Sequence, residues 1–541
     1  MKCLEFFKKI LTKKEGKEQR VVNSLEDLNI SEREDFVKQM KLGPGLSDNL
    51  QKITDIFGNS FDLNIRKIKI GTQQIDAALV FLVGVSDPVA VEKILRDLQI
   101  SLLELQLNDE ADLLIETITR QALNNKTVVV SAQFSEILKK TTTGSAALFI
   151  EGYSRAIICE TRGYETRNIQ EPEAEISIRG PRDGFVENVF TNSSLLRQRI
   201  RIPHLWLQKF EMGSLTKINV AIAYIKGLAS EELIDEVKSR IERIDVDSIL
   251  ESGYIQEYIS DEAMSVFPLI KRTERPDKVV FGLLEGKVAI LTGGTPFVLI
   301  LPATFEDFLK APDDYYETFP IGSFIRLLRY IAYPISIFLP GIYVGIIEFH
   351  PELIPIDLLL RIAATREGVP FPVIVEAFLM AFLFEVLREA GIRLPKAIGS
   401  AISIVGALIL GEAAIDAGLA SPPMIVIVAL TAIASFTTPD FAFGIAARIL
   451  RFVFLFLGGS IGLFGIQFGI LILLIHLCAL RSFGQPYFQP FGPLVLQDMK
   501  DSIARFPWWS LIFRSKLVGG REPQRQKKGQ KPRPPVKRKG E

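Results

Sequence analysis

A run of apolar segments between about 330 and 480 constrains the fold of this chain more than any other feature. No Asp, Glu, Lys or Arg occurs within 330–347, 417–439 or 452–480. Each window approaches or exceeds the roughly 17 to 25 residues that a helix needs to cross a hydrocarbon core. One such window fits the buried helix of a soluble protein. Several in series predict an α-helical, polytopic membrane bundle, which we place at 321–497.

Charge is unevenly distributed, although the totals are equal, with 63 Lys and Arg against 63 Asp and Glu. Charges of both signs fill the first 320 residues, whereas the last 28 are strongly basic. The cysteines, Cys3, Cys159 and Cys478, are too few and too scattered for a disulfide framework, which fits a reducing compartment. Because no apolar segment of the signal-peptide type accompanies Cys3, we expect the N-terminal region to stay in the cytoplasm.

The charge-rich half predicts two α/β subdomains in tandem, at 46–170 and 171–320, after a polar arm over 1–45 that we expect to be disordered. Strand-like and helical patterns follow one another in the first subdomain, and the pattern restarts after the Pro- and Glu-rich joint IQEPEAE. The stretch 287–301 is free of charge between its ends, but TGGTP interrupts it and its β-branched flanks are short. A β-hairpin is therefore favoured there over a first membrane span.

The membrane half contains apolar segments at about 326–348, 371–390, 396–416, 418–438 and 452–480. Basic residues flank them as the positive-inside rule predicts for a cytoplasmic N-terminus. Five crossings would place the C-terminal region, 498–541, outside, yet this amphipathic segment and basic disordered tail should lie inside. An even number of crossings is favoured, with the last segment broken or re-entrant near Gly458-Gly459-Ser460.

Carboxylates within the apolar segments are candidate functional groups, because an ionisable side chain at membrane depth is costly unless it is paired or faces water. Glu376 and Glu385 belong to the second segment, and Asp416 lies near the end of the third. Pairing with Arg388 explains Glu385, and a helix end explains Asp416. Glu376 is harder to explain by placement at the membrane interface.

Small residues recur at helical spacing in the third segment, and two interpretations of this stripe remain open. It begins at Gly399, and such spacing is typical of close helix packing. The alternative is a conduction path for cations, lined by hydroxyl and carboxyl groups. The pore-lining candidates are Ser400, Ser403, Ala407, Gly411 and Glu412. In the last segment we interpret Gly458, Gly462, Gly465 and Gly469 as packing residues.

No catalytic or metal site is expected. His204, His350 and His476 are isolated, and the sequence has neither HExxH nor CxxC. We therefore expect neither an enzyme nor a cofactor. The basic tail predicts attraction to an anionic lipid leaflet rather than nucleic-acid binding, since it has no aromatic platform.

Several blocks closely resemble the A subunits of the spore germinant receptors of endospore-forming bacteria, the GerA type. They are IRGPRDGFVEN, TERPD, GKVAILTGGTPFVLILPATF followed by DDYY, EFHPELIP, REGVPFPVIVEAFLMAFLFEVLREAGIRLPKAIGSAISIVGALILGEAAIDAGL and SFGQPYFQPFGP. The resemblance runs from about 60 to 515 in the same order.

This resemblance implies a subunit of the spore inner membrane with a cytoplasmic N-terminal region and C-terminal tail. The partners that it implies are a transporter-like B subunit, which binds the nutrient, and a lipoprotein C subunit. It also implies self-assembly into a ring, with five subunits as the expected number, that opens to release cations when nutrients bind. A non-conducting scaffold or signalling subunit is the alternative.

Overall fold

The computed structural model describes residues 29–70, 74–101, 118, 127–163, 179–393, 411–515 and 522–533, with a few positions between 171 and 177. It forms two compact units. The α/β unit comprises Met1–Ser260, Ile270–Pro302 and Trp508–Glu541, and the helical unit comprises Asp261–Leu269 and Ala303–Pro507.

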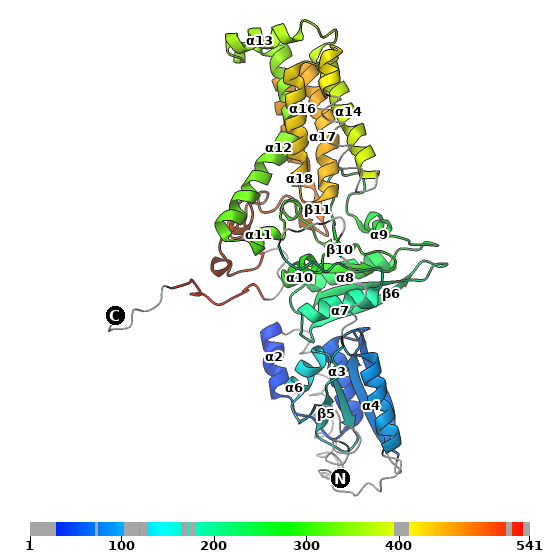
Figure 1. The fold of residues 1–541 in the computed structure, drawn as a ribbon. Coiled ribbons are helices and arrows are strands. Elements are labelled where there is room, and N and C mark those ends of the chain that lie inside the picture. The colour runs from blue at the N-terminus through cyan, green and yellow to red at the C-terminus, as the bar shows by residue number, and fades with distance from the viewer. Residues whose placement is uncertain are drawn as a thin grey trace, which may run out of the picture. The chain divides into compact units, whose positions relative to one another are not determined.

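The first subdomain of the α/β unit is an antiparallel five-stranded sheet in the order β1-β2-β4-β5-β3 (Figure 1). Its strands are β1 (Leu63–Ile70), β2 (Ile75–Leu82), β3 (Val128–Ser131), β4 (Ala146–Ile150) and β5 (Ala156–Cys159), and its helices include α2 (Ile30–Gln39), α3 (Leu46–Phe57), α4 (Pro88–Ser101) and α6 (Phe134–Thr142). Apolar residues alternate to both faces of the central strands, so helices can pack against each face.

The second subdomain repeats this topology, with the strand order β6-β7-β9-β10-β8. Its strands are β6 (Leu205–Met212), β7 (Ile218–Ile225), β8 (Lys271–Thr273), β9 (Val288–Thr292) and β10 (Val298–Leu301), and its helices are α7 (Val189–Arg199), α8 (Glu231–Glu242), α9 (Ser252–Ile259) and α10 (Pro276–Leu284). The β9–β10 hairpin occupies the charge-free stretch 287–301, so this stretch is not a helical span.

Local details also correspond between the two subdomains. A glycine with positive φ follows β2 at Gly84 and β7 at Gly227. Each turn closes with a parallel bridge, Val83 to Ser86 in the first and Lys226 to Ala229 in the second. The α/β organisation in tandem thus extends to the same turn at equivalent positions of two sheets with the same strand order.

A buried ion pair joins the two subdomains. The guanidinium of Arg197 donates to both carboxylate oxygens of Asp62, at 2.7 and 3.1 Å, and neither side chain is more than 1% exposed. The indole Nε1 of Trp206 donates to the carbonyl oxygen of Ile56 at 3.0 Å. Its ring covers Gly58, which has φ +62° and leaves no space for a Cβ. These contacts fix the subdomains to each other.

Two segments predicted to be disordered contain ordered parts. Within the arm 1–45, α2 is a helix with a capping box between Asn29 and Glu32, and its Val37 is buried in the core of the first subdomain. In the C-terminal tail, Arg525 forms an ion pair with Glu285 of α10. The prediction failed here because polar composition hides a few residues that have specific partners.

The helical unit contains α12 (Phe319–Phe349), α13 (Ile356–Arg366), α14 (Val373–Arg393), α16 (Pro422–Phe436), α17 (Phe441–Ile461) and α18 (Leu463–Ala479) (Figure 1). Two of its described helices, α12 and α17, are long and apolar enough to cross a membrane, and α16 and α18 are shorter apolar helices. Ahead of α12 lie the 3₁₀ helix η2 (Phe305–Phe308) and the short helix α11 (Asp313–Tyr316), and the 3₁₀ helix η4 (Asp498–Asp501) follows α18.

The last apolar segment is broken, as the sequence suggested, but at Gly462 (φ +70°) rather than at 458–460. A Cβ at Gly469 of α18 would lie 2.7 Å from a Phe454 ring carbon of α17, so α18 folds back along α17. Tyr333 of α12 and Tyr487, which follows α18, share one aromatic cluster with Phe305. The first helix of the bundle and the segment that follows α18 are therefore close together at this aromatic cluster.

Candidate functional site

Glu376 is the most deeply buried of the predicted intramembrane acids, with no exposed surface. Its Oε1 accepts hydrogen bonds from the backbone N–H of Ser421, at 2.7 Å, and from the Ser421 hydroxyl, at 2.6 Å. Because Ser421 is the N-cap of α16, the carboxylate of α14 satisfies one of the free N–H groups at that helix end. Arg366 of α13 lies 3.5 Å from the other oxygen.

Glu385 is half-buried and pairs across the bundle with Arg448 of α17, at 2.6 Å. The sequence suggested Arg388 as its partner, one helical turn away on the same helix. Instead, Arg388 donates to the hydroxyl of Ser435 and lies over the ring of Phe436. The local prediction was wrong because the structure brings a base on a distant helix closer than the neighbour in sequence.

The pore-lining candidates are only partly within the described residues. Ser400, Ser403 and Ala407 lie outside them, as does the packing candidate Gly399. Glu412 and Asp416 lie on a helical stretch and are exposed. Gly411 lies on the same stretch, where a Cβ would make an ordinary contact with Ile425.

The packing glycines of the last segment lie close to main-chain atoms. A Cβ at Gly458 would overlap the carbonyl oxygen of Gly341 on α12, and one at Gly345 would lie 3.3 Å from the Gly458 oxygen. Gly465 faces the Leu457 carbonyl in the same way. The helix that contacts α17 through these glycines is thus α12.

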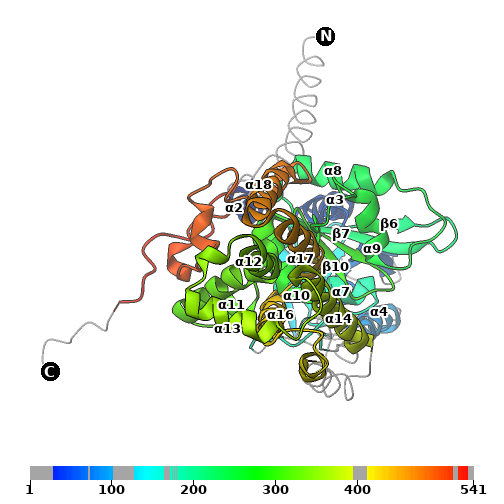
Figure 2. The same ribbon diagram turned by 90° about the horizontal axis from the view of Figure 1, so that it is seen from above.

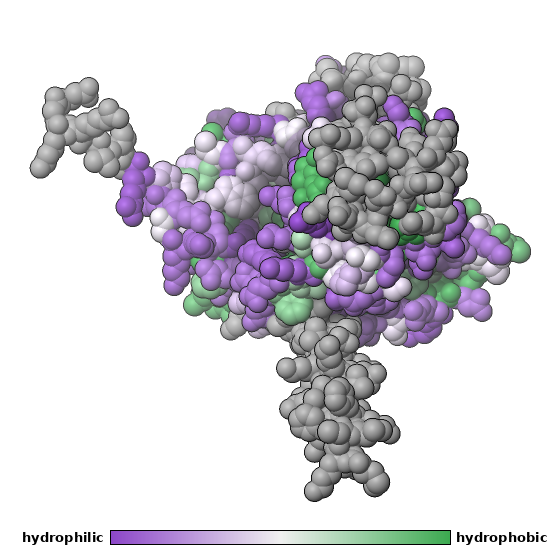
Figure 3. Space-filling model, turned by 90° about the horizontal axis from the view of Figure 1, so that it is seen from below, coloured by the Kyte–Doolittle hydropathy of each residue, from purple (hydrophilic) through white to green (hydrophobic). Residues whose placement is uncertain are grey.

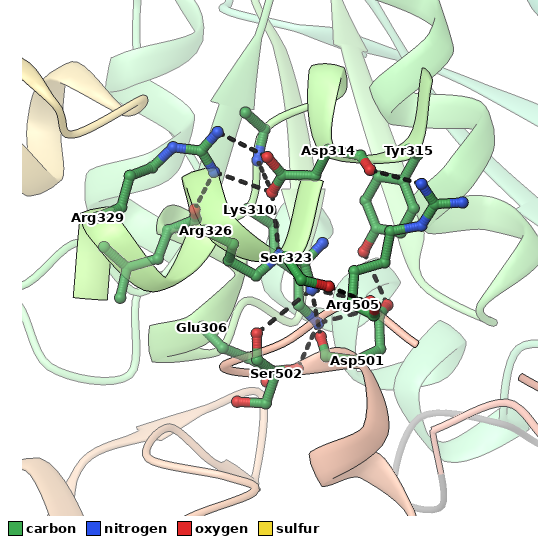
Figure 4. Close-up of polar contacts among 12 residues, drawn as sticks. Glu306, Lys310, Asp314, Tyr315, Ser323, Arg326, Arg329, Asp501, Ser502 and Arg505 are labelled. Atoms are coloured by element: carbon green, nitrogen blue, oxygen red, sulfur yellow. Dashed lines mark hydrogen bonds and ion pairs between the residues drawn. The ribbon is translucent and has the colours of Figure 1, made fainter. Parts of the chain in front are cut away.

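A larger cluster of buried charges, which the sequence did not predict, lies at the start of α12 (Figure 4). Asp314 of α11 is its centre and has no exposed surface. It accepts from Arg326 Nε at 3.0 Å and from two nitrogens of Arg329, at 2.9 and 2.6 Å. Both arginines belong to the first turns of α12, three residues apart on one face. The pairing therefore fixes α11 to α12.

The segment after α18 joins the same cluster. Arg326 Nη1 donates to Asp501 Oδ1 at 2.8 Å, and the hydroxyl of Tyr315 donates to Oδ2 at 2.7 Å. Arg505 donates from Nη1 to the carbonyl oxygens of Asp314 and Glu317, both at 2.8 Å. These carbonyls lie at the C-terminal end of α11, where intrahelical partners run out. We call this group of side chains the charge cluster; its members are Glu306, Lys310, Asp314, Tyr315, Arg326, Arg329, Asp501 and Arg505.

The charge cluster joins two parts of the helical unit that lie far apart in the sequence. The longer stretch of this unit runs from Ala303 to Pro507. The segments adjoining these points, 303–317 and 498–507, both contribute side chains to the cluster. Both ends of this stretch are therefore held to α12 through Arg326. The described residues contain no group of three His, Cys, Asp or Glu side chains placed to hold a metal.

Lys310 of the charge cluster lies between two carboxylates, Glu306 at 2.6 Å and Asp501 at 3.9 Å. Burial would lower the pKa of Lys310, but both carboxylates hold it well above its usual value. Burial would raise the pKa of Asp501, but Lys310 and Arg326 lower it. Glu306 has fewer partners, and its Oε2 accepts no hydrogen bond from the described residues. Burial therefore outweighs Lys310 and raises the pKa of Glu306 to about 7.

The raised pKa of Glu306 predicts a pH-dependent stability. Because its unfolded pKa is about 4.3, folding takes up a proton between that value and about 7. The stabilisation is fully present below the unfolded pKa and is lost as the pH rises through about 7. We expect the thermal unfolding midpoint of the full-length chain in detergent to fall as the pH rises from about 5 to about 7.5. Glu306→Gln should flatten this profile, whereas Glu352→Gln at an exposed site should not; a Glu306→Gln variant that keeps the original slope contradicts the assignment.

Comparison with known proteins gives one consistent result. The model of the family described as "Bacillus/Clostridium GerA spore germination protein" matches residues 51–517. Spore germination protein KA of Bacillus subtilis (strain 168) is 45% identical over 498 residues, 92% of this chain and 91% of that protein. Spore germination protein B1 of the same organism is 37% identical over 468 residues, 86% of this chain and 96% of that protein.

A solved structure is also similar in sequence over about half of the chain. It is the crystal structure of the N-terminal domain of the A subunit of the Bacillus megaterium spore germinant receptor GerK3. The two chains are 35% identical, and the match covers 49% of this chain and 98% of that chain, with a TM-score of 0.40.

Proposed function

Since the chain belongs to the GerA family of spore germination proteins, we propose that it is a membrane subunit of a nutrient-responsive germinant receptor and forms a cation channel by self-assembly. The family predicted from the sequence blocks is confirmed. The proposal adds a helical unit that spans the spore inner membrane, with the N-terminal region and the tail in the cytoplasm. Its partners are a transporter-like B subunit, which binds the nutrient, and a lipoprotein C subunit.

The observation that carries the membrane proposal is the number of large apolar side chains exposed on the helices. Examples on α16, α17 and α18 are Val426, Ile433, Phe436, Phe456, Phe464, Phe468, Ile472 and Ile475, each at least 59% exposed. Water-soluble monomers rarely expose continuous apolar surfaces of this kind, whereas a lipid environment favours them. The proposal therefore places α12, α14, α16, α17 and α18 within the bilayer.

The channel proposal rests on polar groups beside this apolar surface. Glu412 and Asp416 are exposed carboxylates at the end of the third apolar segment. Such groups are tolerated at membrane depth where they line water, and rings of carboxylates favour cations. A ring of subunits, for which we propose five, would bring copies of this segment around one axis. Ser400, Ser403, Ala407, Gly411 and Glu412 are its proposed lining.

The second candidate is a non-conducting signalling subunit, which the charge cluster favours. Segments from the start and the end of 303–507 meet α12 there, so a shape change could pass through this unit without any ion path. In this case the chain would transmit nutrient binding by the B subunit to another channel. The two candidates differ in one measurable property, which is ion flux through the purified chain.

Reconstitution of the purified full-length chain in liposomes separates these candidates. A channel predicts potassium efflux that Ser403→Trp abolishes, because a large side chain would block a narrow path. Ile433→Trp is the matched control, since Ile433 is 63% exposed on α16 and should face lipid. Efflux that survives Ser403→Trp contradicts the pore lining. A stable ring without efflux favours the signalling subunit.

A further inference from the structure

An apolar stripe on the α/β unit is left exposed by the described structure. Leu250, Tyr254 and Tyr258 follow one another at intervals of four residues along α9 and its N-terminal side, and they are 59%, 46% and 57% exposed. Leu215, which is 79% exposed, belongs to the same surface. Its backbone N–H donates to the carbonyl oxygen of Asp247, 2.9 Å away, which holds it near the segment that leads into α9. We call these four side chains the α9 stripe. The opposite face of α9 is buried, so the helix position itself is fixed.

The surroundings of the α9 stripe are acidic. Glu257 lies between the two tyrosines in sequence and is exposed, as are Asp245 and Asp247 beside Leu250. Figure 3 shows that hydrophilic residues dominate the described surface on the side that it presents, with hydrophobic residues in separate patches. An apolar patch with a polar rim is typical of an interaction site, and tyrosine is enriched at such sites. The acidic rim favours a basic partner.

The C-terminal tail of this chain has the complementary chemistry. Residues 527–539 contain seven Lys and Arg and no acidic residue, and they include Pro532, Pro534 and Pro535. Lys527, Lys528 and Lys531 are exposed in the described part. Proline-rich segments bind aromatic surfaces at a small entropic cost, because proline already restricts the chain to an extended form. Acidic residues beside the tyrosines would then attract the flanking bases.

The start of the tail is fixed on the side of the α/β unit away from α9. Arg525 pairs with Glu285 and lies over the ring of Phe281 on α10, 5.7 Å from its centroid. Arg514 donates from Nε to the Leu284 carbonyl oxygen at 2.8 Å. From there the described tail runs outward on the side opposite α9, as the two views in Figures 1 and 2 agree. In this structure the described tail runs away from α9 of its own chain.

We propose that residues 527–539 of one copy dock on the α9 stripe of the next copy in the assembly. Tail and stripe are different surfaces of one unit, so the contact is heterologous, and a heterologous contact generates a ring when its rotation closes. This inference rests on the proposed ring. The family match ends at residue 517, before the tail, so the contact strengthens an assembly that other surfaces form.

Photo-crosslinking of the full-length chain in detergent tests this contact. A benzoylphenylalanine at position 258 should produce crosslinked dimers, and peptide mass spectrometry should locate the second attachment within 527–541. Mixing isotopically labelled with unlabelled chains shows whether the link joins two copies. The same photoreactive residue at Val89, which is 74% exposed on α4, is the control and should not capture the tail. Glu257→Lys should lower the yield of dimers about two- to fivefold, as for an exposed ion pair.

Each outcome separates this contact from the ring itself. A crosslink between labelled and unlabelled chains that disappears when 527–541 is deleted supports the contact, whatever the size of the assembly. A link within one chain, capture of lipid or of another surface, or no capture overturns it. Light scattering on the same samples reports the ring. An intact ring without the crosslink refutes only the tail contact, and monomers without the crosslink refute both proposals.

Discussion

Replacing Asp314 by alanine is expected to destabilise the helical unit by about 3–5 kcal/mol, the usual cost of removing one partner from a buried ion pair. Arg326 has no exposed surface, and the Arg329 side chain is 8% exposed. Without Asp314, Arg329 would keep only the Leu309 carbonyl oxygen as an acceptor in the described structure, and Arg326 would depend on Asp501 and its neighbour Ser502. The thermal unfolding midpoint of the detergent-solubilised full-length chain should fall accordingly.

Further variants distinguish loss of the ion pair from a general effect of mutation. Asp357→Ala removes an exposed carboxylate from α13 and should change stability by less than about 0.5 kcal/mol. Asp314→Asn combined with Arg329→Met removes one charge of each sign, and it should recover part of the loss because no uncompensated arginine remains at that position. If Asp314→Ala unfolds at the same temperature as Asp357→Ala, the charge cluster does not hold α11 and α12 together.

Variants of the charge cluster can also be tested for their response to nutrient. If the response to nutrient passes through the charge cluster, a variant that still folds and assembles should respond poorly to nutrient. The pair Asp314→Asn and Arg329→Met is suited to this measurement, since its fold should be largely kept. Spores carrying it should germinate more slowly at saturating nutrient, with normal amounts of the receptor in the membrane. A normal rate of germination would leave the cluster with a structural role alone.

The sequence contained enough information for the class of each half but not for the charge cluster. Apolar windows predict helices because a charge is costly in lipid or in a protein core. Arg326 and Arg329 lie at the N-terminal side of the first apolar segment, where the positive-inside rule predicts flanking bases, yet both are buried on Asp314. Their partner precedes α12, and Asp501 lies 175 residues further along the chain. Periodicity within one segment cannot identify pairs of this kind.

The repeated α/β topology was partly visible in the sequence. The restart of the pattern after IQEPEAE predicted a second subdomain, and the interrupted stretch 287–301 is the β9–β10 hairpin. The edge strands of the second sheet were not predicted, because their side chains give a weak pattern: β6 contains Gln208, Lys209 and Glu211 among its apolar residues, and β8 has only three residues. The common strand order became apparent only from the pairing of strands far apart in the chain.

For the contact between α12 and α17, the sequence predicted the packing face but not the partner helix. The spacing of Gly458 and Gly462 indicates a helix-packing face, but the sequence does not say which helix lies against it. The structure places Gly341 and Gly345 of α12 opposite them, so two glycine pairs with the same four-residue spacing face each other. The main chains then touch without side chains between them. The helix itself was predicted as the apolar segment 326–348, although it contains prolines at 334 and 340.

The second large effect is expected at this contact. Gly458→Ala should destabilise the helical unit by about 2–3 kcal/mol, because an added Cβ would overlap the carbonyl oxygen of Gly341 and only separation of the two helices could relieve it. Gly458→Val should cost more, since it adds two further carbons at the same point. Backbone atoms cannot rotate away as a flexible side chain can, so little local relaxation is available.

Gly444 provides a matched control on the same helix. A Cβ at this position meets no atom within 4 Å, so Gly444→Ala should be neutral or stabilise α17 by up to about 1 kcal/mol through its better helix propensity. Thermal unfolding of both alanine variants in one detergent measures the difference directly, and crosslinking between cysteines introduced at Ile342 and Leu457 reports whether the helices separate. If Gly458→Ala and Gly444→Ala shift the midpoint equally and leave that crosslink intact, α12 and α17 do not meet through their glycines.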